Sequence, residues 1–386
     1  MRKVIRNCAA AGFNTLEIGW ATPEQAEEAV AYCEQLGINL IYQNLHRYGG
    51  MQGNRYYQGD ALHSVIRELQ NWKCIYGYYI WDEPHLDDQI SQAAQLVNIC
   101  EKEAPDKLPF TVAIPSYNEL YTWDNELFPQ YLEKYVTVID PPQLSLDYYP
   151  IGLPNYHITT QLDNSRMWCD LGLMKKLGHK YDMPLWFYYQ GQNLHKAKLF
   201  TFPMVRSMMY AGALYGAKGL QHFTAVGSII DQDGERAQFF EAQKAIHEEF
   251  KNLGETLMAL DCKRVIHDTS VDPNCAMYKE LHERVSDSTY LSKELPERIS
   301  VSEFGDEYGN GYMMILNRDY MQKKSVVLAL NDKYRVYEVS KEDGLQYLLN
   351  ERTDALALTL DEGDATLIRL QKTDEEAYTI EYRLKK

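Results

Sequence analysis

From its start to about residue 252, the chain alternates short apolar runs of β-forming residues with longer amphipathic helical stretches. Strands that alternate with helices in this way are typical of parallel βαβ units. The pattern therefore predicts an α/β fold with a parallel sheet. The seven runs that we interpret as strands are Phe13–Trp20, Ile38–Leu45, Ile75–Glu83, Pro109–Ile114, Leu144–Tyr149, Leu185–Gln190 and Leu220–Thr224.

The stretches between these strands carry the start and stop signals of helices. Pro23 opens one of them and Gly37 follows its end, as expected for Pro in a first helical turn and Gly just past a last one. A (β/α) barrel of the TIM type takes roughly 250 residues, which fits this part of the chain. The predicted helices include Pro23–Leu36, Ala61–Trp72, Asp88–Lys102, Ser165–Leu177, Pro203–Tyr215 and Gly234–Leu253.

The predicted barrel has one strand fewer than the eight of a complete (β/α)8 barrel. Residues Arg2–Ala11 are typical of the helix that precedes a strand, so the missing strand is the first. A late start codon or a trimmed N-terminus explains this more simply than a natural seven-stranded barrel. We expect a cytoplasmic protein from the chain as given, and a secreted or periplasmic one if a leader has been lost.

After about residue 252, the pattern changes to alternating runs separated by turn sequences. Gly309–Gly311 and Asp361–Asp364 are rich in residues that form tight turns. Several short strands with regular turns predict an antiparallel β-sandwich. We therefore predict a catalytic barrel over residues 1–253 and an all-β domain over 261–386. Its predicted strands are Ile299–Phe304, Tyr312–Asn317, Lys324–Leu328, Tyr334–Glu338, Ala355–Leu360 and Ala365–Leu370.

Function in a parallel barrel gathers where the strands pass into the loops that follow them. Phosphate or carboxylate substrates would require cations at these positions. A neutral polyol instead needs hydrogen-bonding groups and aromatic faces to lie against. The strand ends fit the second description, because they carry acids, amides, imidazoles and phenols without lysine or arginine: Glu17, His46, Asp82, Glu83, Asp147, Tyr148, Gln190, Gln221 and His222.

The composition narrows the partners further. With 39 basic and 55 acidic residues, the net charge is −16, and no basic stripe is present that could displace counterions from a nucleic acid. Thirty tyrosines suit a carbohydrate ligand. The seven cysteines form no CxxC pair and are more typical of buried thiols than of a zinc site. No segment approaches the ~20 apolar residues of a membrane span. The sequence implies no cofactor.

Residues 77–84, Gly-Tyr-Tyr-Ile-Trp-Asp-Glu-Pro, resemble the fourth strand of the large clan of barrel glycoside hydrolases. That strand ends in Asn-Glu-Pro, with Glu as the acid/base. Residues 11–18, 40–46 and 146–150 resemble the second, third and sixth strands in register with it. The resemblance covers residues 1–252, and a trailing β-sandwich is common in the clan. It implies a glycoside hydrolase in which Glu83 is the general acid.

Two departures from the clan affect the mechanism. Asp82 stands where the clan usually has an Asn that hydrogen-bonds the sugar 2-hydroxyl group. Gln190 stands where the clan has its nucleophilic Glu on strand seven, and an amide cannot serve as a carboxylate nucleophile. The retaining mechanism therefore does not carry over. An inverting mechanism, in which a second carboxylate activates water, is the alternative.

Asp147 and Glu17 are both candidates for that second carboxylate. Each would lie on a strand next but one to that of Glu83, at about the 6.5–9.5 Å that leaves room for water. Because neighbouring residues of a strand face opposite sides, we expect Asp82 and Glu83 to point apart. Substrate binding is assigned to His46, Asp82, Tyr148, Trp186, Gln190 and His222, with loop platforms at Tyr48, Tyr56, Tyr57, Tyr117, Tyr121 and Trp123.

A second functional class competes with the hydrolase. A non-catalytic carbohydrate-binding barrel could have lost its strand-seven nucleophile and kept a sugar-shaped pocket. Gln190 favours this class, whereas the Asp82–Glu83 pair and Asp147 favour an enzyme. Another reaction on a sugar, such as elimination, is a third and minor alternative.

Overall fold

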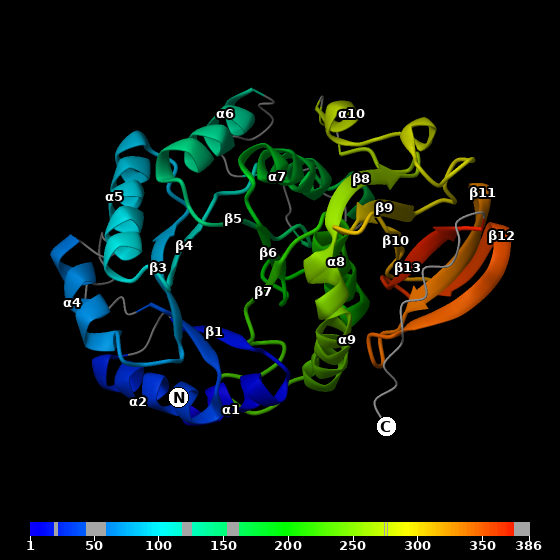
Figure 1. Cartoon of the computed structure of the whole chain (residues 1–386). Helices are drawn as coiled ribbons and strands as arrows, with labels where there is room; N and C mark the ends of the chain where they lie inside the picture. Colours follow the sequence, from blue (N-terminus) through cyan, green and yellow to red (C-terminus); the bar gives the residue numbers. More distant parts are fainter. Residues whose placement is uncertain are drawn as a thin grey trace.

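The computed structural model describes residues 1–18, 22–43, 59–117, 126–152, 162–273, 275 and 277–373. Parallel strands form an inner ring, and helices surround it (Figure 1). Every strand predicted for the first part of the chain is present. These strands are β1 (Thr15–Ile18), β2 (Asn39–Tyr42), β3 (Ile75–Asp82), β4 (Leu108–Val112), β5 (Leu144–Tyr148), β6 (Leu185–Gln190) and β7 (Gly219–Phe223).

The predicted helices are also present, and their ends follow from local hydrogen bonding. At the start of the second helix, the Thr22 hydroxyl accepts from the Gln25 backbone N–H and the Gln25 side chain accepts from that of Thr22. Gly37 ends this helix in the left-handed conformation, with φ 68°. The helices of this part are α1 (Arg2–Ala10), α2 (Pro23–Leu36), α4 (Gly59–Leu69), α5 (Asp87–Glu103), α6 (Leu127–Lys134), α7 (Met167–Tyr181), α8 (Phe202–Leu214) and α9 (Phe240–Ala259).

The start of α9 differs from the prediction, which placed it at Gly234. The Asp231 carboxylate accepts hydrogen bonds from the backbone N–H groups of Asp233 and Glu235, which holds this segment as a turn. Gly234 itself has φ 75°, a conformation that a helix does not use. The helix therefore begins six residues later, at Phe240.

The strands form a four-stranded sheet, β1-β2-β3-β4, and a three-stranded sheet, β5-β6-β7. A single parallel bridge between Ala113 and Leu146 links the two, and the Ala113 N–H donates to the Ser145 carbonyl at 2.8 Å. Within the described residues, β1 and β7 do not pair. Among these residues, the barrel is thus open between β1 and β7. We call this opening the seam.

Side chains from α1, α9 and the segment that follows β7 pack beside the seam. Ala11, Ile229 and Phe240 form a small apolar cluster together with Phe13. On α9, the Nδ1 atom of His247 lies 2.8 Å from the Ala11 carbonyl oxygen. These contacts join the two edges of the barrel without strand pairing.

Alternation along the strands separates two apolar layers. On β6, Phe187 and Tyr189 face outward and belong to the large core between sheet and helices. Trp186 and Tyr188 face the barrel interior. The interior layer is small and consists mainly of Ile41, Tyr79, Phe110, Val112 and Tyr188.

The C-terminal part is one six-stranded antiparallel sheet in the order β12-β11-β13-β10-β9-β8. The two runs predicted at Lys324–Leu328 and Tyr334–Glu338 are a single strand that bulges between Ala329 and Tyr334. The first strand was not predicted, because a bulge between Cys262 and Arg264 breaks its alternation. The strands are β8 (Asp261–His267), β9 (Ile299–Gly305), β10 (Gly311–Asn317), β11 (Lys324–Val339), β12 (Gln346–Leu360) and β13 (Ala365–Lys372).

At β10, both faces of this sheet are buried. On β10, Met314 and Leu316 join the large core of the barrel side, whereas Met313 and Ile315 pack in a second core that includes side chains of β11 and β12. The long hairpin of β11 and β12 forms the edge of the sheet that is farthest from the barrel (Figure 1). A (β/α) barrel with a C-terminal antiparallel domain is the fold that the sequence predicts.

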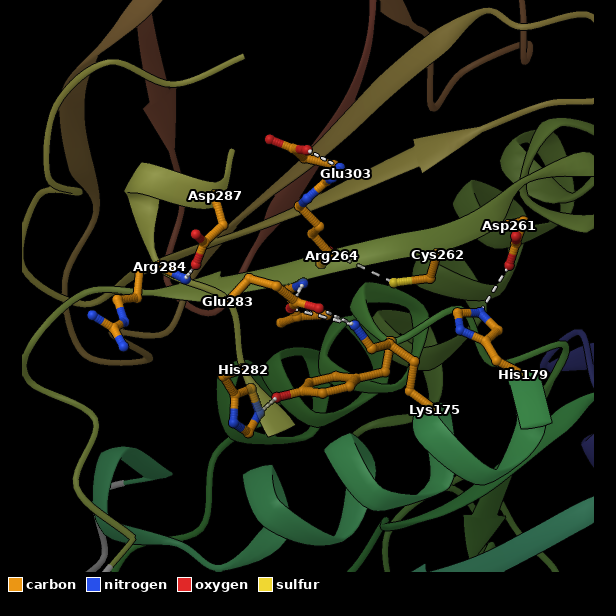
Figure 2. Close-up of polar contacts among 12 residues, drawn as sticks. Lys175, His179, Asp261, Cys262, Arg264, His282, Glu283, Arg284, Asp287 and Glu303 are labelled. Atoms are coloured by element: carbon orange, nitrogen blue, oxygen red, sulfur yellow. Dashed lines mark hydrogen bonds and ion pairs between the residues drawn. The ribbon is translucent and has the colours of Figure 1, made fainter. Parts of the chain in front are cut away.

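Polar contacts connect α7 of the barrel with β8 and the segment after it. The buried Lys175 ammonium lies 3.1 Å from Glu283 Oε1, and Glu283 Oε2 accepts from the Val265 backbone N–H at 2.9 Å. One turn further along α7, His179 lies 2.9 Å from Asp261. Figure 2 shows these α7 side chains pointing toward β8.

A second set of contacts at the same interface is more deeply buried, and we call it the junction cluster. The fully buried Arg318 guanidinium pairs with Asp163 on the barrel side and with Asp268. The Tyr215 hydroxyl, at the end of α8, lies 2.8 Å from His267 Nε2 and 2.5 Å from His282 Nε2. The junction cluster consists of Asp163, Tyr215, His267, Asp268, His282 and Arg318.

In the part of the chain that the structure describes, no helix has the length and apolar character needed to cross a membrane.

Candidate active site

Asp82 is the last residue of β3 and Glu83 the first residue after it. A bulge between Tyr79 and Trp81 shifts the alternation, so Trp81 faces the outer core and Asp82 faces the interior. There the Tyr79 hydroxyl donates to Asp82 Oδ1 at 3.0 Å.

Glu83 leaves the extended conformation of the strand. Its φ of 52° is left-handed, and its N–H donates to the Val112 carbonyl at 3.0 Å. Because the extended conformation ends here, the two-residue alternation no longer applies. The negative charges of Glu83 and Asp82 both act on Asp147, which faces the interior from β5. The structure thus brings three of the predicted carboxylates together.

Each of three carboxyl groups in the interior has a tyrosine as its hydrogen-bond partner. Tyr79 bonds to Asp82 within β3. The Tyr188 hydroxyl on β6 donates to the Glu17 carboxylate on β1. Asp147 is hydrogen-bonded by Tyr149, which follows β5. We call this group the acid–tyrosine cluster; it consists of Glu17, Tyr79, Asp82, Glu83, Asp147, Tyr149 and Tyr188.

The environment makes two of these acids weak. Burial raises the pKa of Asp147 well above its usual range, and the negative charges of Glu83 and Asp82 raise it further, against the hydrogen bond from Tyr149. Solvent reaches Glu17 on one side, but the protein that encloses its other sides raises its pKa to about 7. The Tyr188 hydrogen bond opposes that rise and the charge of Asp82 adds to it. Among the described residues, the groups that act most strongly on either acid include no lysine or arginine.

The phenols remain hydrogen-bond donors over the whole neutral range. Burial, followed by the charges of the nearby carboxylates, raises the pKa of Tyr79, Tyr149 and Tyr188 well above the usual value. The same holds for Tyr117, on which the charges of Asp147 and Glu83 act. The interior therefore offers neutral donors and acidic groups that retain protons at unusually high pH.

An aromatic surface adjoins the carboxylates at the ends of β5 and β7. Tyr149 and Phe223 are stacked with their ring centroids 4.9 Å apart and an interplanar angle of 18°. Phe223 is 38% exposed. A sugar ring could lie against such an apolar face.

Gln190 does not have the position of a ligand. It is completely buried, its Oε1 accepts from the Ile151 N–H at 2.7 Å, and its Nε2 donates to the Ile151 carbonyl at 3.0 Å. It also donates to the Gln192 carbonyl at 3.2 Å. This amide fastens the loop after β5 to the end of β6, so we withdraw its assignment to substrate binding.

His222 faces the outer layer. Its Nδ1 lies 3.2 Å from the Tyr189 hydroxyl and its Nε2 lies 3.3 Å from the Ser228 hydroxyl, so both ring nitrogens have protein partners. Burial lowers the pKa of His222 to about 3, which keeps the ring neutral. Its place is that of a structural histidine rather than a sugar ligand.

Two predicted aromatic ligands also lie elsewhere. Tyr148 is buried in the outer core, where the charge of Asp170 on α7 acts on its phenol. Trp186 also faces the interior, but it lies near the start of β6, whereas Gln190 is at the end of that strand. The Trp186 ring stacks with the Tyr76 ring, with the ring centroids 6.3 Å apart. His46 and the loop aromatics Tyr48, Tyr56, Tyr57, Tyr121 and Trp123 lie outside the described residues.

The sequence analysis did not assign roles to Tyr79, Tyr149 and Phe223. Alternation could have found Tyr149, since it lies two residues after Asp147. Tyr79 could not be found this way, because the bulge after it changes the face of the following residues. Within the described residues, no group of three or more His, Cys, Asp or Glu side chains is arranged to hold a metal ion.

No protein-family model matches the sequence, and no curated protein matches it by sequence. Solved structures match in fold. An α-amylase from Anoxybacillus is 10% identical with a TM-score of 0.56, over 97% of this chain and 90% of that chain. A β-L-arabinopyranosidase from Geobacillus stearothermophilus is 10% identical with a TM-score of 0.51, over 97% of this chain and 93% of that one. Both are glycoside hydrolases by name, and at these identities the likeness shows the fold alone.

Proposed function

We propose that the chain is a glycoside hydrolase whose general acid is Glu83. The observation that carries this proposal is that the negative charge of Glu83 acts on the buried Asp147 at the strand ends of the barrel and, together with burial, raises the pKa of Asp147. Within the part of the chain that the structure describes, the groups that act most strongly on the acids include no lysine or arginine, which favours an uncharged substrate. The fold shared with an α-amylase and an arabinopyranosidase adds weight. We place the catalytic domain at residues 1–253 and the all-β domain at 261–386.

In this mechanism, Glu83 donates its proton to the glycosidic oxygen as the bond to the anomeric carbon breaks. A second carboxylate, Glu17 or Asp147, takes a proton from the water that attacks the same carbon. Gln190 cannot be a nucleophile, because it is an amide and its side chain is bonded to Ile151. The product would therefore emerge with inverted configuration.

The stacked pair of Tyr149 and Phe223 would contact the apolar face of the sugar ring. Its position beside Asp147 would place the ring near the carboxylates. Phenol hydroxyls of the acid–tyrosine cluster would hydrogen-bond sugar hydroxyls as well as the acids.

A non-catalytic carbohydrate-binding barrel is the second candidate, and Gln190 is the observation that favours it. Hydrolysis of a panel of aryl glycosides and natural oligosaccharides distinguishes the two candidates. The hydrolase predicts turnover of at least one member. Binding of an oligosaccharide by calorimetry without any turnover would support the second candidate instead.

The stereochemistry is tested separately on any substrate that is cleaved. The first-formed anomer can be followed by proton NMR before mutarotation. Inversion is expected. Retention would rule out direct attack by water and would require a nucleophile from the protein or from the substrate.

A further inference from the structure

We infer that Tyr188 is a positioning residue that holds Glu17 ready to act as the general base. This inference rests on the proposed glycosidase function, and it decides between the two candidate bases. It follows from the one hydrogen bond that reaches Glu17 from across the barrel and from the different solvent access of Glu17 and Asp147.

The contact joins distant parts of the barrel. Tyr188 lies on β6 and Glu17 on β1, which belong to different sheets and are 171 residues apart in sequence. The Tyr188 hydroxyl donates to Glu17 Oε2. A carboxylate with one oxygen fixed in this way has a restricted rotation, and its other oxygen keeps a defined direction from which to accept a proton.

Access to water separates the two candidate bases. Glu17 is exposed to solvent, whereas Asp147 is 8% exposed. Asp147 Oδ1 is buried and has no hydrogen-bond partner among the described residues. Burial and the charges of Glu83 and Asp82 raise the pKa of Asp147 well above its usual range, which disfavours the ionised form that a general base needs. Because the attacking water must also reach the base, the solvent-exposed Glu17 is the better candidate.

The groups that face Glu17 determine how the base titrates. Tyr188 approaches from β6, and Asp82 and Tyr79 from β3. On the β2 side, its strand partner is the apolar Ile41. Of these groups, only the Tyr188 hydrogen bond lowers the pKa of Glu17.

Loss of the Tyr188 hydroxyl should therefore shift the Glu17 titration upward. A hydrogen bond to a charged group contributes about 1.5–3 kcal/mol, which corresponds to roughly one to two pH units. The base must be ionised to act, so activity falls on the acid side of its titration. The acid limb of the kcat/KM profile should move upward by the same amount.

The first arm of the experiment needs no substrate. In protein labelled with ¹³C at the glutamate carboxyl carbon, one signal should titrate near pH 7 and disappear in Glu17→Gln. In Tyr188→Phe, which keeps the ring and its packing against Phe110, that signal should titrate at higher pH. Tyr189→Phe is the matched control, since Tyr189 is the adjacent buried tyrosine but faces the outer core. It should leave the signal unchanged.

The second arm uses a substrate that the wild type cleaves. Tyr188→Phe should move the acid limb of kcat/KM upward, and Tyr189→Phe should leave it in place. An unmoved titration in Tyr188→Phe would overturn the inference. So would loss of the acid limb in Asp147→Asn with its retention in Glu17→Gln, and this second outcome does not depend on the folding of Tyr188→Phe. If the carboxyl signal moves but the wild type cleaves no glycoside, the proposed function fails and the base role fails with it, while the hydrogen bond stands.

Discussion

The acid–tyrosine cluster and the junction cluster are both buried groups of polar side chains, but they arrange charge in opposite ways. In the acid–tyrosine cluster, like charges lie close together and neutral phenols are their partners. In the junction cluster, the Arg318 guanidinium lies between two carboxylates, and one of them, Asp163, also pairs with Arg298. Like charges that are held together cost folding free energy, whereas paired opposite charges compensate each other's burial.

The two histidines of the junction cluster are also paired within the protein, because each of their ring nitrogens has a hydrogen-bond partner. His282 Nδ1 lies 2.9 Å from the Tyr278 carbonyl oxygen, so it donates there and leaves Nε2 to accept from Tyr215. Tyr215 in turn accepts from His267. Each neutral ring thereby has a partner at both nitrogens, because His267 Nδ1 also lies 2.5 Å from the Ser300 hydroxyl. Such a network fixes a geometry, whereas the acid–tyrosine cluster holds protons that a reaction can use.

Removal of the proposed acid should have the largest effect on rate. We expect Glu83→Gln to lower kcat by about 10²–10⁴-fold, because the amide keeps the size of the side chain but cannot donate the proton. The thermal midpoint should stay the same or rise, since the change removes one of several like charges. Steady-state kinetics and calorimetry on the same preparation provide both measurements. A large loss of stability with unchanged kcat would mean that Glu83 has a structural role and is not the general acid.

The reverse outcome is expected at the junction cluster. Arg318→Met should lower the free energy of unfolding by about 3–5 kcal/mol, because Asp268 loses its buried counter-charge and Asp163 keeps only its pair with Arg298. Chemical denaturation measures this change. Arg2→Met is the control, since the pair of Arg2 with Glu28 is exposed and should contribute about 1 kcal/mol or less. Equal effects of the two substitutions would contradict the assigned role of Arg318.

Stability should depend on pH in opposite directions for the two clusters. Burial lowers the pKa of His282 to about 4 and that of His267 well below its usual value. Unfolded histidine binds protons below about pH 6.5, so this stability is present above pH 6.5 and is lost as the pH falls toward 4. Each such histidine changes the slope by at most about 1.4 kcal/mol per pH unit. His282→Gln should flatten the acid side of a denaturation series taken from pH 4 to 7.

The carboxylates should produce a smaller, opposite trend. Asp147 has a raised pKa in the folded protein, so its contribution is fully present below about pH 4 and is lost as the pH rises above that value toward the pKa of the folded state. Asp147→Asn resembles the protonated acid. We expect it to raise the thermal midpoint at pH 7 and to leave it nearly unchanged at pH 4. A drop at pH 7 would mean that ionised Asp147 stabilises the fold.

The barrel strands could be predicted because strands buried on both faces are apolar runs that stand out between helices. The side to which a particular side chain points was harder to predict. Tyr148 and His222 each lie one residue away from interior positions, and a one-residue step reverses the face. The bulge in β3 turned Asp82 to the interior, and the left-handed Glu83 ended the alternation of the strand. Local backbone irregularity, invisible in a residue pattern, formed the site.

Gln190 illustrates a different limit. Its position on β6 was predicted correctly, since the strand ends at this residue. Its role could not be predicted, because it depends on Ile151. The Ile151 backbone N–H donates to the Gln190 side-chain oxygen, and the Ile151 carbonyl accepts from the Gln190 side-chain nitrogen. A contact between a side chain and a distant backbone group leaves no periodic signal in the sequence.

The pairing of Arg318 with Asp163 has a consequence for protein synthesis. The two residues are 155 positions apart, and Arg318 is made later. At ~5–20 residues per second, a ribosome needs roughly 8–30 s to cover that interval. During this time, the Asp163 carboxylate of the nascent barrel lacks its partner Arg318, whether the carboxylate is exposed or buried. The barrel, which leaves the ribosome before the antiparallel sheet, is therefore completed only by this later part of the chain, and chaperones have that interval in which to act on it.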